Sequence, residues 1–361
     1  MRALFWAALA LGFALRLQAA LAAGGLRPDE KHRYLPIARS LRDGGGFAIA
    51  GRPTAQCMPL WPMVLAAWPE AFEPRLLNAL LSTACLPMAW LVARRLGGTR
   101  VAAAVLVALA VDLDHRPLAG SVLIEPLFTL LLLAFSRAWL ERRTLAAAGL
   151  CGLCALARPE AFLFPLALAA WTREWRRPAA LLCGVVLALA PWVARNALVW
   201  GAFVPFTTTR GITLVSAMNP GEEKLPFRSR GQGRAPEWRE GLPLPAERGE
   251  VRNDRELSRR AERYALDHPG SALKITLAKA VLLWTPFQRK GASAVYAIAV
   301  VLAWWGIFRR VRLSAPLVAP LLCVMTFVGL AFLAIPRYRA PYHFAMYVVA
   351  AASVLSGKAR T

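Results

Sequence analysis

The chain has 361 residues, of which 57% are apolar, and it carries a formal net charge of +23. Its apolar residues form long runs with few charges, a pattern that argues against a water-soluble domain and predicts an all-α polytopic membrane protein. The positive charge does not indicate nucleic-acid binding, because the arginines gather in short segments between the apolar runs, as they do in cytoplasmic loops.

The apolar runs predict about ten membrane-spanning helices. We interpret the first run as a retained helix and not as a cleaved signal peptide, because it is long enough to span a membrane and Arg16 interrupts its core. A break at Arg158–Glu160 leaves open whether residues 144–171 form one span or two. The predicted spans are 3–23, 74–93, 101–112, 117–135, 144–157, 160–171, 179–195, 291–307, 313–334 and 340–356.

The positions of the arginines predict the orientation of these spans. If the amino end lies inside, all the basic clusters between spans face the cytoplasm. Two large loops, 24–73 and 196–276, then lie outside in the periplasm, and residues 271–287 form a helix on the outer surface. The protein would be one bacterial inner-membrane domain, 1–361, that closes with the spans in 291–356. The second loop has too few apolar residues to build a core of its own, and its polar stretch 206–256 is expected to be a mobile cover.

Several arginines violate this pattern, because they fall in the outer connections or at the outer ends of spans. They are Arg116, Arg158, Arg195, Arg337 and Arg339. One explanation is that each side chain extends to the lipid headgroups. Together they indicate an anionic ligand at the outer face, such as a lipid phosphate, since a guanidinium can bind two phosphate oxygens at once.

Acidic residues lie on the same predicted face. Asp29 and Glu30 follow the first span, and Asp112 and Asp114 form a second acidic pair. Glu125 falls inside a span, where an ionisable residue is costly and is a functional candidate, although it could also hold two helices together by a hydrogen bond. Acids that accept a proton, beside arginines that hold a phosphate, would suit group transfer from a phosphate-linked lipid.

Five stretches carry a resemblance to a known family. They are "PDEKHRYLPIARSLRDGGGF", "SVLIEPLF", "LARPEAFLFPLAL", "PWVARNALVWGAFVPFTTTRGITLVSAMNP" and "IPRYRAPY". In order and spacing they resemble the GT-C superfamily of integral-membrane glycosyltransferases. The nearest resemblance is to the bacterial dolichyl-phosphate-mannose protein mannosyltransferase group, which includes the lipid A aminoarabinose transferases.

The resemblance implies a GT-C fold and sugar transfer, with inversion, from a polyprenyl-phosphate donor to a lipid, glycan or protein acceptor. It implies that an acid of the first loop is the catalytic base, here Asp29 or its neighbour Glu30. The family's tyrosine usually lies four residues after the first acid, whereas Tyr34 lies five after Asp29. Pro36 would also interrupt a helix begun at Asp29. We favour Asp29 over Glu30 and leave the choice open.

The other site residues are assigned on the same basis. Arg158, Arg337 and Arg339 are predicted to bind the donor phosphate, with Lys279 as a weaker candidate. Tyr34, Glu125 and Arg195 are predicted to support the site. Asp112 and Asp114, with Glu30, could bind Mg²⁺ or Mn²⁺, or could belong to a solvated loop; His115 and His343 are interpreted as lone histidines that bind no metal.

Two functions of other classes remain open. A lipid-phosphate flippase or transporter would use the arginines but would not need Asp29. Transporters often contain internal repeats of spans, and the sequence shows none. The second of these alternatives is an inactive assembly subunit.

Overall fold

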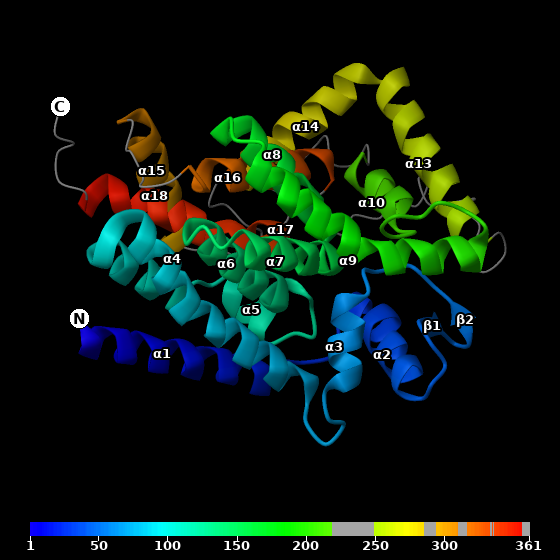
Figure 1. Cartoon of the computed structure of the whole chain (residues 1–361), viewed down its shortest axis with the longest axis horizontal. Coiled ribbons are helices and arrows are strands. Elements are labelled where there is room, and N and C mark those ends of the chain that lie inside the picture. Colours follow the sequence, from blue (N-terminus) through cyan, green and yellow to red (C-terminus); the bar gives the residue numbers. More distant parts are fainter. Residues whose placement is uncertain (219–248, 285–293, 310–315, 333, 335, 356–361) are drawn as a thin grey trace.

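The computed structural model describes residues 1–218, 249–284, 294–309, 316–332, 334 and 336–355 (Figure 1). These residues are almost entirely helical, and their regular β-structure is one short antiparallel hairpin in which β1 (Ala48–Ile49) pairs with β2 (Arg52–Pro53).

Three helices are long and apolar enough to cross a membrane: α1 (Arg2–Leu21), α4 (Pro74–Ala110) and α9 (Arg176–Trp200). Shorter apolar helices are α7 (Thr144–Ala157), α15 (Ala294–Phe308) and α16 (Val318–Ala331). Large apolar side chains are exposed on the outside of this bundle, among them Trp6, Leu187 and Phe308. Such a surface is suited to lipid contact. The protein therefore has the features of a multi-pass membrane protein, while the number of about ten spans stays a prediction.

The structure describes both pairs of neighbouring spans that the sequence separates by a short break. The spans 74–93 and 101–112 lie in one element, α4, which is broken at Gly98 with φ 82° and ψ −176°, a conformation that favours glycine. The run 144–171 forms two helices, because α7 ends at Ala157 and α8 (Leu163–Thr172) follows a short 3₁₀ turn, Pro159–Phe162.

The predicted span 117–135 is not one helix. It divides into the short helix α5 (His115–Ala119) and α6 (Glu125–Leu140), with an irregular segment between them. Side chains satisfy the backbone groups of that segment: the Asn78 amide donates to the carbonyls of Ser121 and Leu123 at 2.7 and 2.8 Å, and Trp61 Nε1 donates to that of Val122 at 2.9 Å. These partners replace the hydrogen bonds that a continuous helix would supply.

The helices meet around a shared core. Glycines let two of them approach closely, since a Cβ on Gly152 of α7 would lie 2.6 Å from the carbonyl oxygen of Gly184 in α9. Near the carboxyl end, α17 (Pro336–Arg339) and the 3₁₀ turn Ala340–Tyr342 connect to the buried helix α18 (His343–Leu355).

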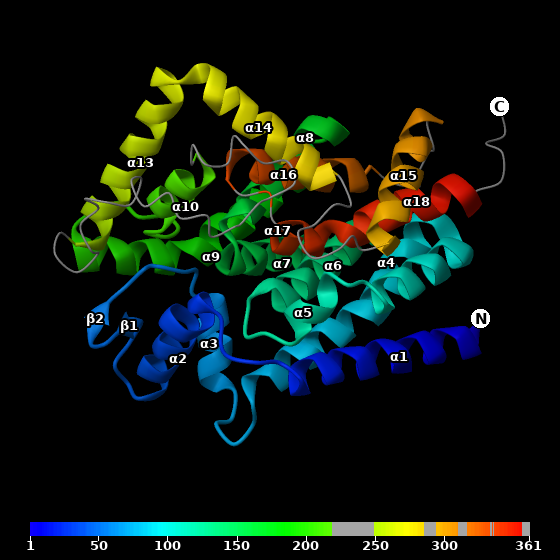
Figure 2. The ribbon, with the colours of Figure 1, turned by 180° about the vertical axis from the view of Figure 1, so that it is seen from behind.

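Most elements of the two large loops lie at the same end of the molecule, while residues 269–284 run back toward α8 and α16 (Figures 1 and 2). The first loop contains a π-helical turn (Glu30–Tyr34), α2 (Leu35–Arg42), the hairpin and α3 (Leu60–Ala67). The second contains α10 (Arg210–Ala217), α13 (Glu250–Asp267) and α14 (Pro269–Trp284).

A partly buried carboxylate joins the loops. Glu250 of α13 accepts hydrogen bonds from Thr54 Oγ1 at 2.6 Å, Ala55 N at 3.0 Å and Gln56 Nε2 at 3.2 Å, all in the first loop, and from Thr208 Oγ1 at 2.8 Å. This contact requires both loops to lie on the same side of any membrane that the helices cross.

The polar stretch 206–256 is more ordered than its composition predicts. Val215 of α10 packs with Leu257 and Ala261 of α13 in a small core of its own. The expectation that the second loop forms no core of its own was therefore wrong for these two helices, because each contributes an apolar stripe to the other. Residues 219–248 of the stretch lie outside the described residues.

Candidate functional site

Asp29 stands at the start of an unusual turn. The next five residues form a π-helix, in which the N–H of Leu35 donates to the carbonyl of Glu30, and α2 then begins at Leu35 with Pro36 in its first turn. The α-helix thus starts beside Pro36 and not at Asp29, although the chain before it already forms a π-helical turn. π-Turns occur frequently at functional sites, and here the turn fixes the direction of two adjacent carboxylates.

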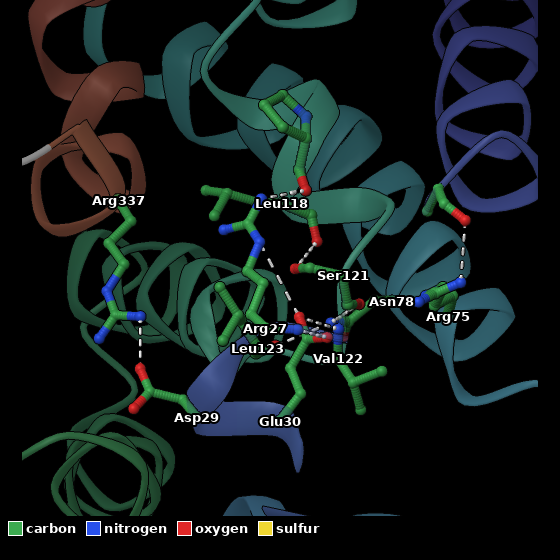
Figure 3. Close-up of polar contacts among 12 residues, drawn as sticks. Arg27, Asp29, Glu30, Arg75, Asn78, Leu118, Ser121, Val122, Leu123 and Arg337 are labelled. Carbon is green, nitrogen blue, oxygen red and sulfur yellow. Dashed lines mark hydrogen bonds and ion pairs between the residues drawn. The ribbon is translucent and has the colours of Figure 1, made fainter. Parts of the chain in front are cut away.

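The carboxylate of Asp29 binds two arginines. Its Oδ2 lies 2.7 Å from Arg337 Nη1 (Figure 3). Its Oδ1 lies 3.2 Å from Arg33 Nη1. Burial raises the pKa of the Asp29 carboxyl, but the guanidinium groups of Arg337 and Arg33 lower it by more, so this pKa lies below its ordinary value. Asp29 is therefore a carboxylate at neutral pH.

Glu30 has a different environment from its neighbour. Its side chain is 1% exposed, and its two oxygens accept hydrogen bonds from the backbone N–H groups of Val122 at 3.0 Å and Arg27 at 2.9 Å. In Figure 3 it extends toward Val122, while Asp29 extends toward Arg337. Glu30 therefore fastens the first loop to the segment between α5 and α6.

Arg337 also begins a chain of charges. Its Nε lies 3.6 Å from Glu125 Oε1, and the same oxygen lies 3.7 Å from Arg158 Nη1. Arg158 Nε in turn lies 2.6 Å from Glu160. The ring of Tyr338 lies against both guanidinium groups, 4.6 Å from Arg158 and 5.2 Å from Arg337. Three segments distant in the sequence thus place two cations around one buried carboxylate.

This cluster contains buried polar atoms whose hydrogen-bonding capacity is not used. Glu125 Oε2 and Tyr342 Oη have no hydrogen-bond partner among the described residues, and neither has Arg337 Nε. A buried polar group without a hydrogen bond is costly unless a ligand or ordered water satisfies it. The region around Glu125 is therefore a candidate place for a polar ligand.

Two other predicted supporting residues take different positions. Tyr34 packs against the apolar cores beside the site. Arg195, near the carboxyl end of α9, donates to the carbonyls of Thr54 and Phe47 at 2.8 Å each. Arg195 therefore fastens the first loop to α9, and neither residue is an unused group aimed at a ligand.

Arg339 and Lys279 are occupied elsewhere. Arg339 is 2% exposed, donates to the carbonyl of Leu282 at 3.0 Å near the end of α14, and lies 3.3 Å from Asp114 Oδ2. Lys279 Nζ donates to the carbonyl of Leu330 at 3.2 Å. Both side chains therefore have partners in α14, α16 and the acidic pair.

The second acidic pair has histidine partners. Asp112 Oδ2 accepts hydrogen bonds from His343 Nδ1 and Tyr347 Oη, both at 2.7 Å. His115 Nε2 donates to the carbonyl of Ala340 at 2.9 Å. Ligand atoms of Asp112, His115 and His343 all lie within 4.8 Å of one another.

Two sequence-based interpretations of this region need correction. The histidines are not lone residues, because their rings lie 5.8 Å apart in an edge-to-face contact beside Asp112. Glu30 does not join Asp112 and Asp114, since its oxygens are bound to the backbone at Arg27 and Val122.

Three residues of the site were missed from the sequence. They are Arg33, Glu160 and Tyr338. Glu160 was visible only as part of a break between two spans, and Tyr338 only as the residue between two arginines. A search for acidic residues close in sequence to each arginine of the outer connections would have found Glu160. It would not have found the contact of Arg33 with Asp29.

Comparison with known proteins gives matches in structure only. No protein-family profile matches the chain, and no curated protein sequence does. Two crystal structures of ArnT from Cupriavidus metallidurans match over 98% of this chain, each with a TM-score of 0.46. The structure bound to undecaprenyl phosphate has 18% identity and is covered over 77% of its length; the apo structure has 17% identity and 78% coverage. At this level of similarity the roles of individual residues do not transfer.

Proposed function

We propose that the protein is a GT-C glycosyltransferase of the bacterial inner membrane. It would transfer a sugar from a polyprenyl-phosphate donor to an acceptor at the periplasmic face. The observation that supports this best is the sharing of Arg337 by Asp29, at 2.7 Å, and by Glu125, at 3.6 Å. A candidate base and a candidate phosphate-binding cation are thereby adjacent at the end of the bundle where the two large loops lie.

The donor phosphate would bind between Arg337 and Arg158. Both guanidinium groups lie within 4 Å of Glu125 Oε1, so this carboxylate holds two mutually repelling cations together. A phosphate offers several oxygens to such planar donors and binds them in pairs. Tyr338 lies against both cations and restricts their orientation.

The proposed reaction uses each of these groups once. The acceptor's oxygen or nitrogen forms a bond to the anomeric carbon of the sugar, and its proton passes to the Asp29 carboxylate. The bond between that carbon and the phosphate oxygen breaks, and its electron pair stays on the polyprenyl phosphate. The extra negative charge of this leaving group is stabilised by Arg337 and Arg158.

Donor binding would also prepare the base. In the structure Arg337 lowers the pKa of Asp29 and so weakens it as a proton acceptor. A phosphate that binds Arg337 shares its positive charge, and the basicity of Asp29 then rises. Asp29 is preferred over Glu30 because both oxygens of Glu30 are bound to backbone N–H groups that would lose their partners.

Arg339 and Lys279 are proposed to act indirectly. Arg339 holds α14 against α17, which carries Arg337, and Lys279 holds α14 against α16. They would thereby position the phosphate-binding side chain without contacting the phosphate.

A divalent cation is not required by this proposal. Asp112 is already hydrogen-bonded to His343 and Tyr347, and Asp114 is paired with Arg339. Two imidazoles and a carboxylate are also poor ligands for Mg²⁺, which prefers oxygen atoms. We therefore route no step through a metal.

Binding of undecaprenyl phosphate to the purified protein tests the proposed donor site. We expect Arg337→Ala to weaken binding by roughly tenfold or more, because a charge-assisted contact is lost. Arg116→Ala is the matched control, since Arg116 is also a partly exposed arginine but contacts Gln18 instead of the site. Equal binding by the wild type and Arg337→Ala would show that the donor phosphate does not bind at Arg337.

A further inference from the structure

A second basic feature lies away from the candidate site. A groove of about 1110 Å³ runs between the carboxyl end of α9, at Trp200–Ala202, and one face of α13. Gly201 adopts a left-handed conformation with φ 59°, which ends α9 and turns the chain under α13. The groove shares no lining residue with the cluster of Asp29, Glu125 and Arg337.

The wall that α13 contributes is an arginine stripe. Arg252, Arg255, Arg259 and Arg263 are exposed and line the groove. At 100° per residue they fall within about 80° of one another around the helix axis, and they extend over about 16 Å. No ion pair of these four arginines is recorded with another described residue. The acids in the groove are Glu256 and Asp267, so positive charge is in excess.

The floor of the groove belongs to the bundle. Trp200 ends a helix that is apolar and long enough to span a membrane. Beside it, Leu198 is 88% exposed and Phe203 is 73% exposed. Tryptophan and arginine beside exposed apolar residues are typical of the boundary between hydrocarbon and headgroups. The arginine stripe would therefore lie at the depth of lipid phosphates.

We propose that this groove binds the phosphate headgroup of an anionic lipid in the leaflet that faces the two large loops. The guanidinium groups of the stripe bind the phosphate oxygens, and the acyl chains lie along the exposed apolar residues at the end of α9. The lipid would fix α13 on the membrane surface. This inference depends on the membrane position of α9 and not on the proposed sugar transfer.

Native mass spectrometry of the purified full-length protein tests the proposal. Phosphatidylglycerol and phosphatidylcholine are the two lipid probes. We expect Arg255→Gln with Arg259→Gln to weaken phosphatidylglycerol binding by roughly tenfold and to leave phosphatidylcholine binding unchanged. The matched control is Arg39→Gln with Arg52→Gln, which removes the same charge from exposed positions in the first loop. The control should bind phosphatidylglycerol like the wild type.

Two results would overturn the proposal. One is equal loss of phosphatidylglycerol binding in both double variants, which would assign the effect to total charge. The other is displacement of phosphatidylglycerol by equimolar soluble glycerol phosphate, which would identify the ligand as a free phosphate. The double variant Arg255→Lys with Arg259→Lys controls for a folding defect. It keeps the positive charge and should retain most of the phosphatidylglycerol binding.

Discussion

Arg337 Nη1 lies 2.7 Å from Asp29 Oδ2, although the two residues are 308 positions apart in the chain. The contact connects the turn after the first membrane helix with the segment before the last helix. It places the candidate base against the candidate phosphate-binding residue. Each should therefore change the behaviour of the other.

The first prediction concerns the pH dependence of the reaction. Arg337 helps to hold the pKa of Asp29 below its ordinary value of 3.8. The attraction between the Asp29 carboxylate and Arg337 thus stabilises the fold above the pKa that Asp29 has in the unfolded chain. This stabilisation is lost as the pH falls through the lowered pKa of Asp29 in the folded protein. In the acid limb of kcat/KM, which reports the free enzyme, Arg337→Ala should move the midpoint to higher pH. The control variant Arg52→Ala should leave this midpoint unchanged. If Arg337→Ala also left it unchanged, the protonation of Asp29 would not control the rate.

The second prediction distinguishes a planar guanidinium from a point charge. Arg337→Lys keeps the positive charge but cannot bind two phosphate oxygens in parallel. Its affinity for undecaprenyl phosphate should fall between those of the wild type and Arg337→Ala, measured on purified protein. If lysine restored wild-type affinity, Arg337 would act by charge alone.

The third prediction concerns the junction of the two loops. Glu250 accepts four hydrogen bonds, three of them from Thr54, Ala55 and Gln56. Glu250→Ala should destabilise the protein by about 2 kcal/mol, because hydrogen bonds to a charged group are lost. A thermal-shift measurement should show a lower melting temperature than for Glu262→Ala, whose exposed carboxylate pairs only with Arg210 among the described residues. Equal melting temperatures would show that Glu250 does not stabilise the junction.

The fourth prediction concerns metal content. The guanidinium of Arg339 lies 3.3 Å from Asp114 Oδ2 and would repel a cation there. Purified protein should therefore contain far less than one equivalent of manganese, magnesium or zinc by elemental analysis. One tightly held equivalent, lost in His115→Asn and His343→Asn, would instead assign a metal to Asp112 and the two histidines.

The sequence predicted the helical segments because a long apolar run indicates a helix without any knowledge of how that helix packs. It did not predict that residues 120–124 leave the helix, because that depends on Asn78, Trp61 and Glu30 reaching them from other segments. The separation of the spans 74–93 and 101–112 was predicted, whereas the backbone conformation of Gly98 between them is not specified by composition.

Candidate site residues were found where a charge violated a membrane rule. Glu125 stood inside an apolar run, and Arg158 and Arg337 stood in connections that should be poor in arginine. The same rule also selected Arg195 and Arg339, which the structure shows bound to backbone carbonyls. A charged residue in or beside a predicted span is expected to have a specific partner, but which partner it has depends on residues that only the fold brings together.

The role of Asp29 as the base is the central claim, and mass spectrometry of the cell envelope tests it most directly. Lipids, glycans and proteins would be compared from cells without the gene and from cells that produce the wild type, Asp29→Asn or Asp43→Asn at equal levels in the membrane. Asp43 is an exposed acid of the same loop and supplies the matched control. We expect a product heavier by one sugar with the wild type and with Asp43→Asn. With Asp29→Asn it should fall by about 10²–10⁴-fold, because an amide cannot accept the proton. A wild-type amount of product with Asp29→Asn would contradict the account.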